Sequence, residues 1–90
     1  MKTHHYIVSG RVQGVFFRYY TKETADKLSI KGTVRNLFNG DVEVYAQGET
    51  ANLESFENFL GQGPPSAEVK NLIKKVVDSE GEYSDFRIVY

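Results

Sequence analysis

The chain of 90 residues is long enough for one hydrophobic core but not for two, and we expect a single domain over residues 1–90. Apolar residues (40%) and charged residues (26%) are present in the proportions of a folded protein, which excludes a disordered chain. Eleven basic against twelve acidic residues exclude a general attraction to nucleic acid or to an acidic membrane, and the absence of cysteine excludes disulfides, thiolate metal sites and cysteine nucleophiles.

A strand and an amphipathic helix are predicted at the start of the chain. Residues 5–12 alternate between two faces, with Tyr6 and Val8 on one of them, and are rich in β-branched side chains, which indicates a strand. From Phe17 onward apolar residues recur at helical spacing, which indicates a helix that ends near Ser29. Serine is unusual at a helix exit, because glycine or asparagine adopts the left-handed conformation more easily.

The middle of the chain predicts a β-hairpin followed by a second helix. Residues 32–38 and 41–48 flank Asn39-Gly40, a dipeptide that suits the positive φ angles of a type I′ turn. Residues 50–61 carry one apolar stripe, with Thr50 available as the N-cap. The helix is expected to stop at Gly61 or Gly63, where the sequence GQGPPSA (61–67) indicates a loop.

The last third of the chain is less clear from its pattern. Apolar residues within 68–81 fit helical spacing better than strict alternation. We nevertheless interpret this segment as a strand, because it is rich in β-branched residues and because a strand here completes β-α-β-β-α-β, a compact two-layer α+β unit. Residues 85–90 alternate again and predict a final strand.

The sequence GRVQGVFFR (10–18) carries the first candidate site. A loop from about Gln13 to Phe17 would join the first strand to the first helix, so several backbone amides there would lack partners and would point at a helix N-terminus, where anions bind. Gly14 allows a tight turn, and the planar guanidinium of Arg18 can hold two phosphate oxygens. The alternative is an ordinary strand–helix loop with a solvated arginine. The nucleotide-binding patterns G-x-x-x-x-G-K-[ST] and G-x-G-x-x-G are absent.

Two separated motifs resemble those of the acylphosphatases, small enzymes that hydrolyse carboxyl–phosphate anhydrides. GRVQGVFFR matches the first motif, with Gln-Gly-Val and an aromatic residue directly before arginine. The resemblance covers the whole chain, including GPPSAEV and the ending FRIVY. The second motif is matched, at the expected spacing, by Gly32, Val34, Arg35, Asn36, Gly40, Val42 and Gly48.

The resemblance implies a ferredoxin-like βαββαβ sandwich with an antiparallel sheet and two helices on one face. It also implies that Arg18 binds the substrate phosphate and that Asn36 holds the attacking water. The phosphate would be bound further by the backbone amides of Gln13, Gly14, Val15, Phe16 and Phe17. Thr33 departs from the family, whose members usually carry a larger residue there, and this puts local packing in doubt rather than these roles.

Two other functions fit parts of the sequence. The first is a non-catalytic module that binds phosphate or carbamoyl phosphate, because domains of this family also occur within larger maturation proteins. The second is an RNA-binding domain, because GVFFRYY faintly resembles an aromatic and basic RNA-binding strand. We disfavour it because these aromatic residues fall in a loop and at a helix start.

We expect no metal, no cofactor, no nucleic-acid partner and no membrane partner. His4 and His5 are adjacent, so on a strand they face opposite sides and cannot chelate one ion together. Asp41 and Glu43 would be solvated carboxylates at a strand edge. Because no signal peptide or membrane span is present, we expect a cytoplasmic protein. The resemblance implies that it acts on a small acyl phosphate, and we expect a monomer.

Overall fold

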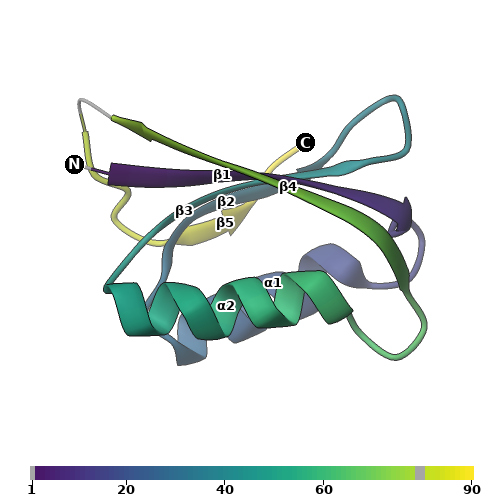
Figure 1. Ribbon diagram of the computed structural model, residues 1–90, viewed down its shortest axis with the longest axis horizontal. Coiled ribbons are helices and arrows are strands. Elements are labelled where there is room, and N and C mark those ends of the chain that lie inside the picture. Colours follow the sequence, from purple (N-terminus) through teal and green to yellow (C-terminus); the bar gives the residue numbers. More distant parts are fainter. Residues whose placement is uncertain (1, 79–80) are drawn as a thin grey trace.

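Two helices and five strands form the part of the chain described by this computed structural model, residues 2–78 and 81–90. Both helices lie on the same face of one sheet, so the molecule has two layers (Figure 1). Neither described helix has the length and apolar character needed to traverse a bilayer. In chain order the elements are β1 (Lys2–Arg11), α1 (Phe17–Lys27), β2 (Lys31–Asn36), β3 (Val42–Gln47), α2 (Thr50–Gln62), β4 (Glu68–Asp78) and β5 (Phe86–Ile88).

The sheet has the strand order β4-β1-β3-β2-β5, which confirms the predicted ferredoxin-like fold. β1 pairs antiparallel with both β3 and β4, and β2 pairs antiparallel with β3. The prediction of a wholly antiparallel sheet is wrong at one edge, because β5 runs parallel to β2. This last strand follows the βαββαβ unit and extends its sheet, so it can take either direction without changing the unit.

Strand directions decide which loops meet at one end of the sheet. β1 and β2 are both antiparallel to β3 and therefore run in the same direction, and β5 runs parallel to β2. The carboxyl ends of these three strands, at Arg11, Asn36 and Ile88, consequently lie at the same end of the sheet. The loop that enters α1 starts from this end, and so does the hairpin turn after Asn36.

The core fills the space between the sheet and the helices. Tyr6 and Val8 of β1 are fully buried, as their alternation predicts, and they face the apolar stripe of α2. Within that stripe the ring of Phe56 packs edge-on against Tyr6 (6.4 Å between centroids) and against Phe86 of β5 (5.9 Å). Through these two contacts Phe56 joins the helix layer to two strands at once. Burying one such ring contributes about 1.5–3 kcal/mol to the free energy of unfolding.

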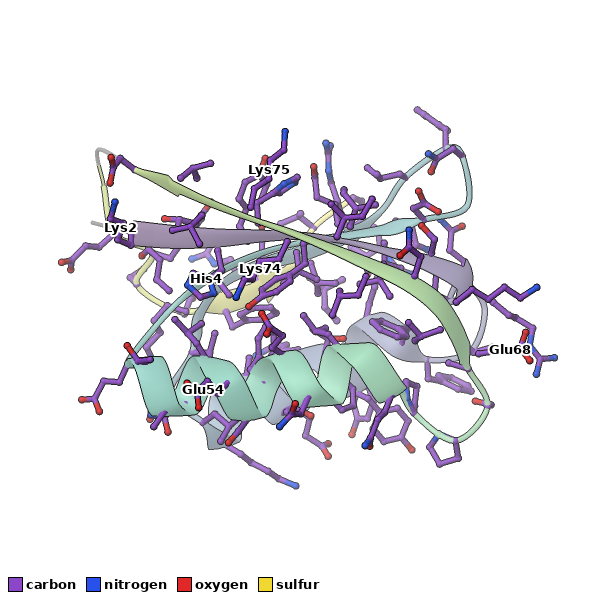
Figure 2. The ribbon with its side chains drawn as sticks, in the orientation of Figure 1. Lys2, His4, Glu54, Glu68, Lys74 and Lys75 are labelled. Carbon is purple, nitrogen blue, oxygen red and sulfur yellow. The ribbon has the colours of Figure 1, made fainter. Side chains whose placement is uncertain are left out.

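β4 confirms the strand prediction for the ambiguous segment. It pairs with the whole length of β1, and successive side chains alternate between the two faces of the sheet. Figure 2 shows this alternation at its centre, where Lys74 points toward α2 and Lys75 points away from the helices. Two features account for the helical spacing of its apolar residues. A bulge at Ser9 and Gly10 shifts the register of β4 against β1, which interrupts the alternation along β4. This outer strand is also largely exposed, so its sequence need not alternate strictly between apolar and polar residues. Residues 79–80 of the predicted segment lie outside the described residues.

Two local predictions are wrong. The hairpin does not have a type I′ turn at Asn39-Gly40, because φ is positive at Gly40 (97°) but not at Asn39. The connection runs instead from 37 to 41 and is closed by hydrogen bonds between Leu37 and both Gly40 and Asp41. The N-cap of α2 is Glu49 rather than Thr50, without a side-chain capping bond. The predicted stop at Gly63 and the left-handed conformation at Ser29 (φ 57°) are both observed.

Candidate active site

A cleft of about 360 Å³ opens at the end of the sheet where β1, β2 and β5 finish. The loop before α1 forms one wall, the end of β2 forms another, and the end of the chain after β5 closes the third side. Arg18 is the sole charged residue among the described residues that line it. The lining residues are Val12, Gly14, Phe16, Phe17, Arg18, Tyr19, Asn36, Ile88 and Tyr90.

The β1–α1 loop (residues 12–16) presents free backbone amides beside this cleft. Two of its residues have left-handed backbone angles, Gly14 (φ 73°) and Phe16 (φ 62°, ψ 23°), and Phe16 is the N-cap of α1. Over the described part of the chain, none of the amides of Gln13, Gly14, Val15 and Phe16 donates a hydrogen bond to a protein acceptor. Unpartnered amides at a helix N-terminus form a site for an anion.

The loop is held by side-chain hydrogen bonds rather than by its own amides. The side-chain amide of Gln13 donates to the carbonyl oxygens of Leu37 (2.7 Å) and Asp41 (2.8 Å), both in the hairpin turn after β2. On the other side, the hydroxyl of Ser66 donates to the carbonyl oxygen of Val15 at 3.3 Å. These bonds fix the loop from two sides and leave its amides available.

Arg18 lies in the first turn of α1 and carries its charge into the cleft. Its Cζ atom lies 5.0 Å from the centroid of the Tyr90 ring, within the range of a cation–π contact. Among the described residues no carboxylate forms an ion pair with Arg18, whereas Arg35 is bound to Glu43 and Arg87 to Asp85. Its positive charge is therefore available to an anionic ligand.

Asn36 is the last residue of β2 and reaches the same cleft. Its backbone pairs with Val42 of β3, which fixes the position of the side chain. Its Oδ1 atom is buried and accepts no hydrogen bond from the described residues. A buried acceptor without a partner is costly and is uncommon in folded proteins, and this one belongs to a residue that lines the cleft beside Arg18.

The titratable groups with shifted pKa values lie mostly outside the cleft. On the helix-free face of the sheet, Glu43 receives hydrogen bonds from His5 (2.9 Å) and Arg35 (2.7 Å). Burial favours the neutral form of Glu43, but these two hydrogen bonds and charges outweigh it and lower its pKa. The expectation of a solvated Glu43 is therefore wrong, since its side chain is only 12% exposed.

Tyr19 stays a neutral phenol at the edge of the cleft. A hydrogen bond to Glu23 on the next turn of α1 raises its pKa above the ordinary value, and the nearby charge of Glu23 acts in the same direction. In residues 2–78 and 81–90 we found no group of three or more histidine, aspartate or glutamate side chains placed to hold a metal ion.

The predicted site residues come together at this end of the sheet. Arg18 and Asn36, which are separated in sequence, line one cleft along with Gly14. Gln13 and Val15 belong to the same loop, but the side chain of Gln13 binds the hairpin turn and that of Val15 packs against the core.

Sequence reasoning missed two contributors to the site. The pattern of residues 85–90 placed Tyr90 in a strand, and nothing in it indicated a contact with Arg18. The bracing role of the Gln13 side chain depends on the hairpin turn lying beside the loop, which is a tertiary relationship without a local signal.

Comparisons with known proteins point to one family. A family model for acylphosphatases matches residues 4–88. The acylphosphatase of Paenarthrobacter aurescens is 44% identical over 82 residues, which cover 91% of this chain and 87% of that protein. The crystal structure of acylphosphatase from Bacillus subtilis superposes with a TM-score of 0.95 at 38% identity and covers all of both chains.

A solved structure of full-length HypF, in its phosphate- and nucleotide-bound form, contains a region similar to this chain. The TM-score is 0.82 at 29% identity, and the match covers all of this chain but only 12% of the larger protein. Most of the length of the Paenarthrobacter and Bacillus relatives is matched, in contrast. Nothing in these comparisons favours the non-catalytic binding module over the enzyme.

Proposed function

This chain belongs to the acylphosphatase family and hydrolyses the carboxyl–phosphate bond of acyl phosphates, and from that premise we propose which residues carry out the reaction. Arg18 and the amides of the β1–α1 loop bind the phosphoryl group, and Asn36 positions the attacking water. One observation supports this assignment above the others. Within residues 2–78 and 81–90, the loop amides have no protein acceptor, Arg18 has no carboxylate partner and Asn36 Oδ1 has no donor, and all three features lie at one cleft.

The phosphoryl group is bound by complementary charge and by shape. The amides of Gln13 to Phe17 donate to its oxygens, and the partial positive charge of the α1 N-terminus adds to them. The guanidinium of Arg18 takes two oxygens at once, which fixes the orientation of the group as well as its position. Because phosphoryl transfer is accelerated chiefly by positioning and by electrostatic stabilisation, these groups supply most of what the reaction requires.

The leaving group explains why the site has no general acid. Water attacks phosphorus while the bond from phosphorus to the acyl oxygen breaks, and the products are a carboxylate and inorganic phosphate. A carboxylate has low proton affinity and leaves without being protonated. A histidine or carboxylic acid in the cleft is therefore unnecessary, and the lining residues offer none.

Asn36 orients the water without deprotonating it. Its Oδ1 atom accepts a hydrogen bond from the water, and its amide group can donate to a neighbouring oxygen. An amide is too weak a base to remove the proton, which passes instead to an oxygen of the phosphoryl group. Correct placement of a reactant in this way contributes without any proton transfer to the protein.

The positive charge of Arg18 and the loop amides takes the place that a metal ion has in many phosphoryl-transfer enzymes. We propose accordingly that the reaction needs neither a metal nor another cofactor. The substrate is a small acyl phosphate, without nucleic-acid or membrane partners, and the 90 residues act as one monomeric domain. The complete absence of cysteine fits a reducing compartment such as the cytoplasm.

Hydrolysis of benzoyl phosphate in the presence of EDTA tests the assignment directly. Wild type should show saturable turnover that EDTA leaves unchanged, and Arg18→Ala should lose it. Arg87→Ala is the matched control, because Arg87 is exposed and bonded to Asp85 away from the cleft. Saturable turnover in Arg18→Ala would contradict the role of Arg18, and activity that is lost with EDTA and restored by magnesium would contradict the metal-free reaction.

A further inference from the structure

Three exposed aromatic rings surround the mouth of the cleft. Phe16 is 75% exposed, Tyr19 54% and Tyr90 94%, and all three line the cleft that contains Arg18 and Asn36. Phe16 and Tyr19 continue into an adjoining apolar hollow with Tyr20, whose ring meets that of Tyr19 edge-on at 5.3 Å. A contiguous exposed apolar surface of this kind marks a binding site more often than a chance arrangement.

The fold itself does not require a large ring at position 16. Phe16 adopts left-handed backbone angles, which are unfavourable for a bulky residue, and its ring adds nothing to the buried core. Local strain of this kind persists where the surrounding structure imposes it, and it gathers at ligand-binding positions. The conformation holds the ring of Phe16 at the rim, beside the amides of the β1–α1 loop.

Covalent geometry then restricts what can lie against these rings. In an acyl phosphate the acyl carbon is joined to phosphorus through a single oxygen. If the phosphoryl group lies on the loop amides and Arg18, the acyl group must leave it within one or two bonds and meet the walls of the cleft. Among the described residues those walls carry no cationic side chain besides Arg18, so an acyl group with a second negative charge finds no further cation there.

We propose that Phe16, Tyr19 and Tyr90 form the acyl subsite and that they select acyl phosphates with an uncharged aromatic acyl group. This inference rests on the proposed function, because it takes the phosphoryl position from Arg18 and the loop amides. Aromatic faces gain most from offset or edge-on contact with another ring, and the neutral phenol of Tyr19 adds no competing charge. A small acyl group such as acetyl has less apolar surface to place against these rings.

The ratio of kcat/KM for benzoyl phosphate to that for acetyl phosphate measures this selection. Both substrates use the same phosphate site, so a disturbance of that site cancels in the ratio. Phe16→Asn removes the ring and introduces a residue that tolerates left-handed backbone angles. We expect the ratio to fall about tenfold in Phe16→Asn and in Tyr19→Ala, near the lower end of the roughly 10–200-fold that one apolar contact contributes to specificity. Phe16→Tyr, which keeps a ring, should retain the wild-type ratio.

Phe38 provides the matched control. It is a fully exposed ring after β2, and it lines a second hollow on the other side of Arg18. That hollow shares Arg18, Asn36 and Tyr90 with the cleft but does not include Phe16 or Tyr19. Phe38→Ser should leave the ratio unchanged. A ratio that falls in Phe38→Ser but not in Phe16→Asn would overturn the proposal and place the acyl group on the other side of Arg18. An unchanged ratio in both Phe16→Asn and Tyr19→Ala would overturn it as well.

Inhibition by stable analogues provides a test that does not depend on turnover. Phenacylphosphonate and acetonylphosphonate carry the same two acyl groups on an unhydrolysable P–C bond. Wild type should bind the phenacyl compound more tightly, and Phe16→Asn should reduce that preference by the same factor as the kinetic ratio. Equal affinity in wild type would refute the aromatic subsite. If wild type hydrolysed neither benzoyl phosphate nor acetyl phosphate, that result would instead refute the proposed function. Failure of the aromatic subsite and failure of the proposed function are therefore distinguishable.

Discussion

The side-chain amide of Gln13 donates to the main-chain carbonyl oxygen of Leu37 at 2.7 Å, and this bond joins the loop that begins α1 to the turn that follows Asn36. The same amide group also donates to the carbonyl oxygen of Asp41 at 2.8 Å. The two halves of the site come from strands that are not neighbours in the sheet, since β3 separates β1 from β2. Gln13 therefore sets the distance between the β1–α1 loop, whose amides we propose to bind phosphate, and Asn36, which we propose to position water.

Gln13→Ala should lower both stability and activity. The substitution removes two hydrogen bonds, although the carbonyl oxygens of Leu37 and Asp41 each keep a backbone donor, from Gly40 and Leu37 respectively. We expect a loss of about 1–2 kcal/mol in the free energy of unfolding, as for two ordinary intramolecular hydrogen bonds. Urea denaturation measures this loss, and benzoyl phosphate kinetics measure the fall in kcat. Gln13→Glu should be worse in both respects, because a carboxylate would face two carbonyl oxygens and repel the phosphate. Activity in Gln13→Glu equal to that of wild type would contradict the bracing role.

Arg18→Lys tests the geometry of the guanidinium separately from its charge. A lysine keeps the positive charge but cannot hold two oxygens with a planar fork. We expect Arg18→Lys to recover little of the kcat/KM that Arg18→Ala loses. Equilibrium binding of inorganic phosphate, measured by calorimetry, should be weak in both variants. Wild-type kinetics in Arg18→Lys would mean that charge alone is sufficient.

Asn36→Ala should lower activity without lowering stability. The loss of one preorganised hydrogen-bonding group lowers kcat by about 10²–10³-fold in comparable sites. The free energy of unfolding should not fall, because the substitution removes a buried Oδ1 atom that has no hydrogen-bond partner in the described part of the chain. Steady-state kinetics and urea denaturation of the same preparation supply the two numbers. If inhibition by inorganic phosphate weakened as much as kcat fell, Asn36 would be a phosphate ligand rather than a residue that positions water.

Gly32→Ala and Gly14→Ala should differ sharply in stability although both glycines have positive φ angles. At Gly32 (φ 152°) a Cβ atom would collide with the carbonyl oxygen of Tyr45 on the neighbouring strand, whereas at Gly14 (φ 73°) it would meet open space. We expect Gly32→Ala to lose about 3 kcal/mol or more from overpacking and backbone strain together. Gly14→Ala should lose only about 1–2 kcal/mol from strain. Thermal and urea denaturation distinguish the two, and equal losses would contradict the packing argument.

His4 should make the protein less stable in mild acid. Its Nδ1 atom lies 2.9 Å from the hydroxyl of Tyr6, and Figure 2 shows it on the same side of the sheet as Lys74. Burial lowers the pKa of His4 below 6.5 and the charge of Lys74 lowers it further, while Glu57 opposes them. The unfolded chain therefore binds more protons just below pH 6.5, so this contribution to stability is present above that pH and is lost as the pH falls.

Urea denaturation at about pH 7.5 and about pH 5.5 measures this loss. His4→Gln should show a smaller difference between the two conditions than wild type. Lys74→Gln should also reduce the difference, because it removes the cation that opposes protonation of His4. A difference in His4→Gln as large as in wild type would assign the pH dependence to other groups.

The order of the elements could be predicted from the sequence because it follows from short-range patterns, whereas the grouping of Arg18 with Asn36 was implied only by the resemblance to the acylphosphatases. The alternation around Tyr6 and Val8 indicated β1, and the Gln-Gly-Val sequence before Phe16 indicated the loop that α1 follows. β4 was predicted only by requiring a complete two-layer unit, against its own apolar spacing. In the structure β1 and β4 pair along their whole length.

The remaining features depend on contacts between distant residues, for which one sequence contains no signal. The hairpin turn was mispredicted because Asn39-Gly40 is compatible with several turns, and the bonds of Leu37 select among them. The parallel direction of β5 is set by its fit beside β2 and over Phe56. The burial of Glu43 likewise arises from His5 and Arg35, which lie on two other strands.

The pairing of β1 with β4 also governs when the site can form during synthesis. β1 is made first, yet one of its two neighbours in the sheet is residues 68–78, so its outer edge stays open until most of the chain has left the ribosome. Contacts between such distant segments are slow to form, because a long loop must close before they add stability. A chain still in synthesis therefore carries β1 with one edge unpaired, and the sheet that supports the β1–α1 loop is complete only after residues 68–78 have been made.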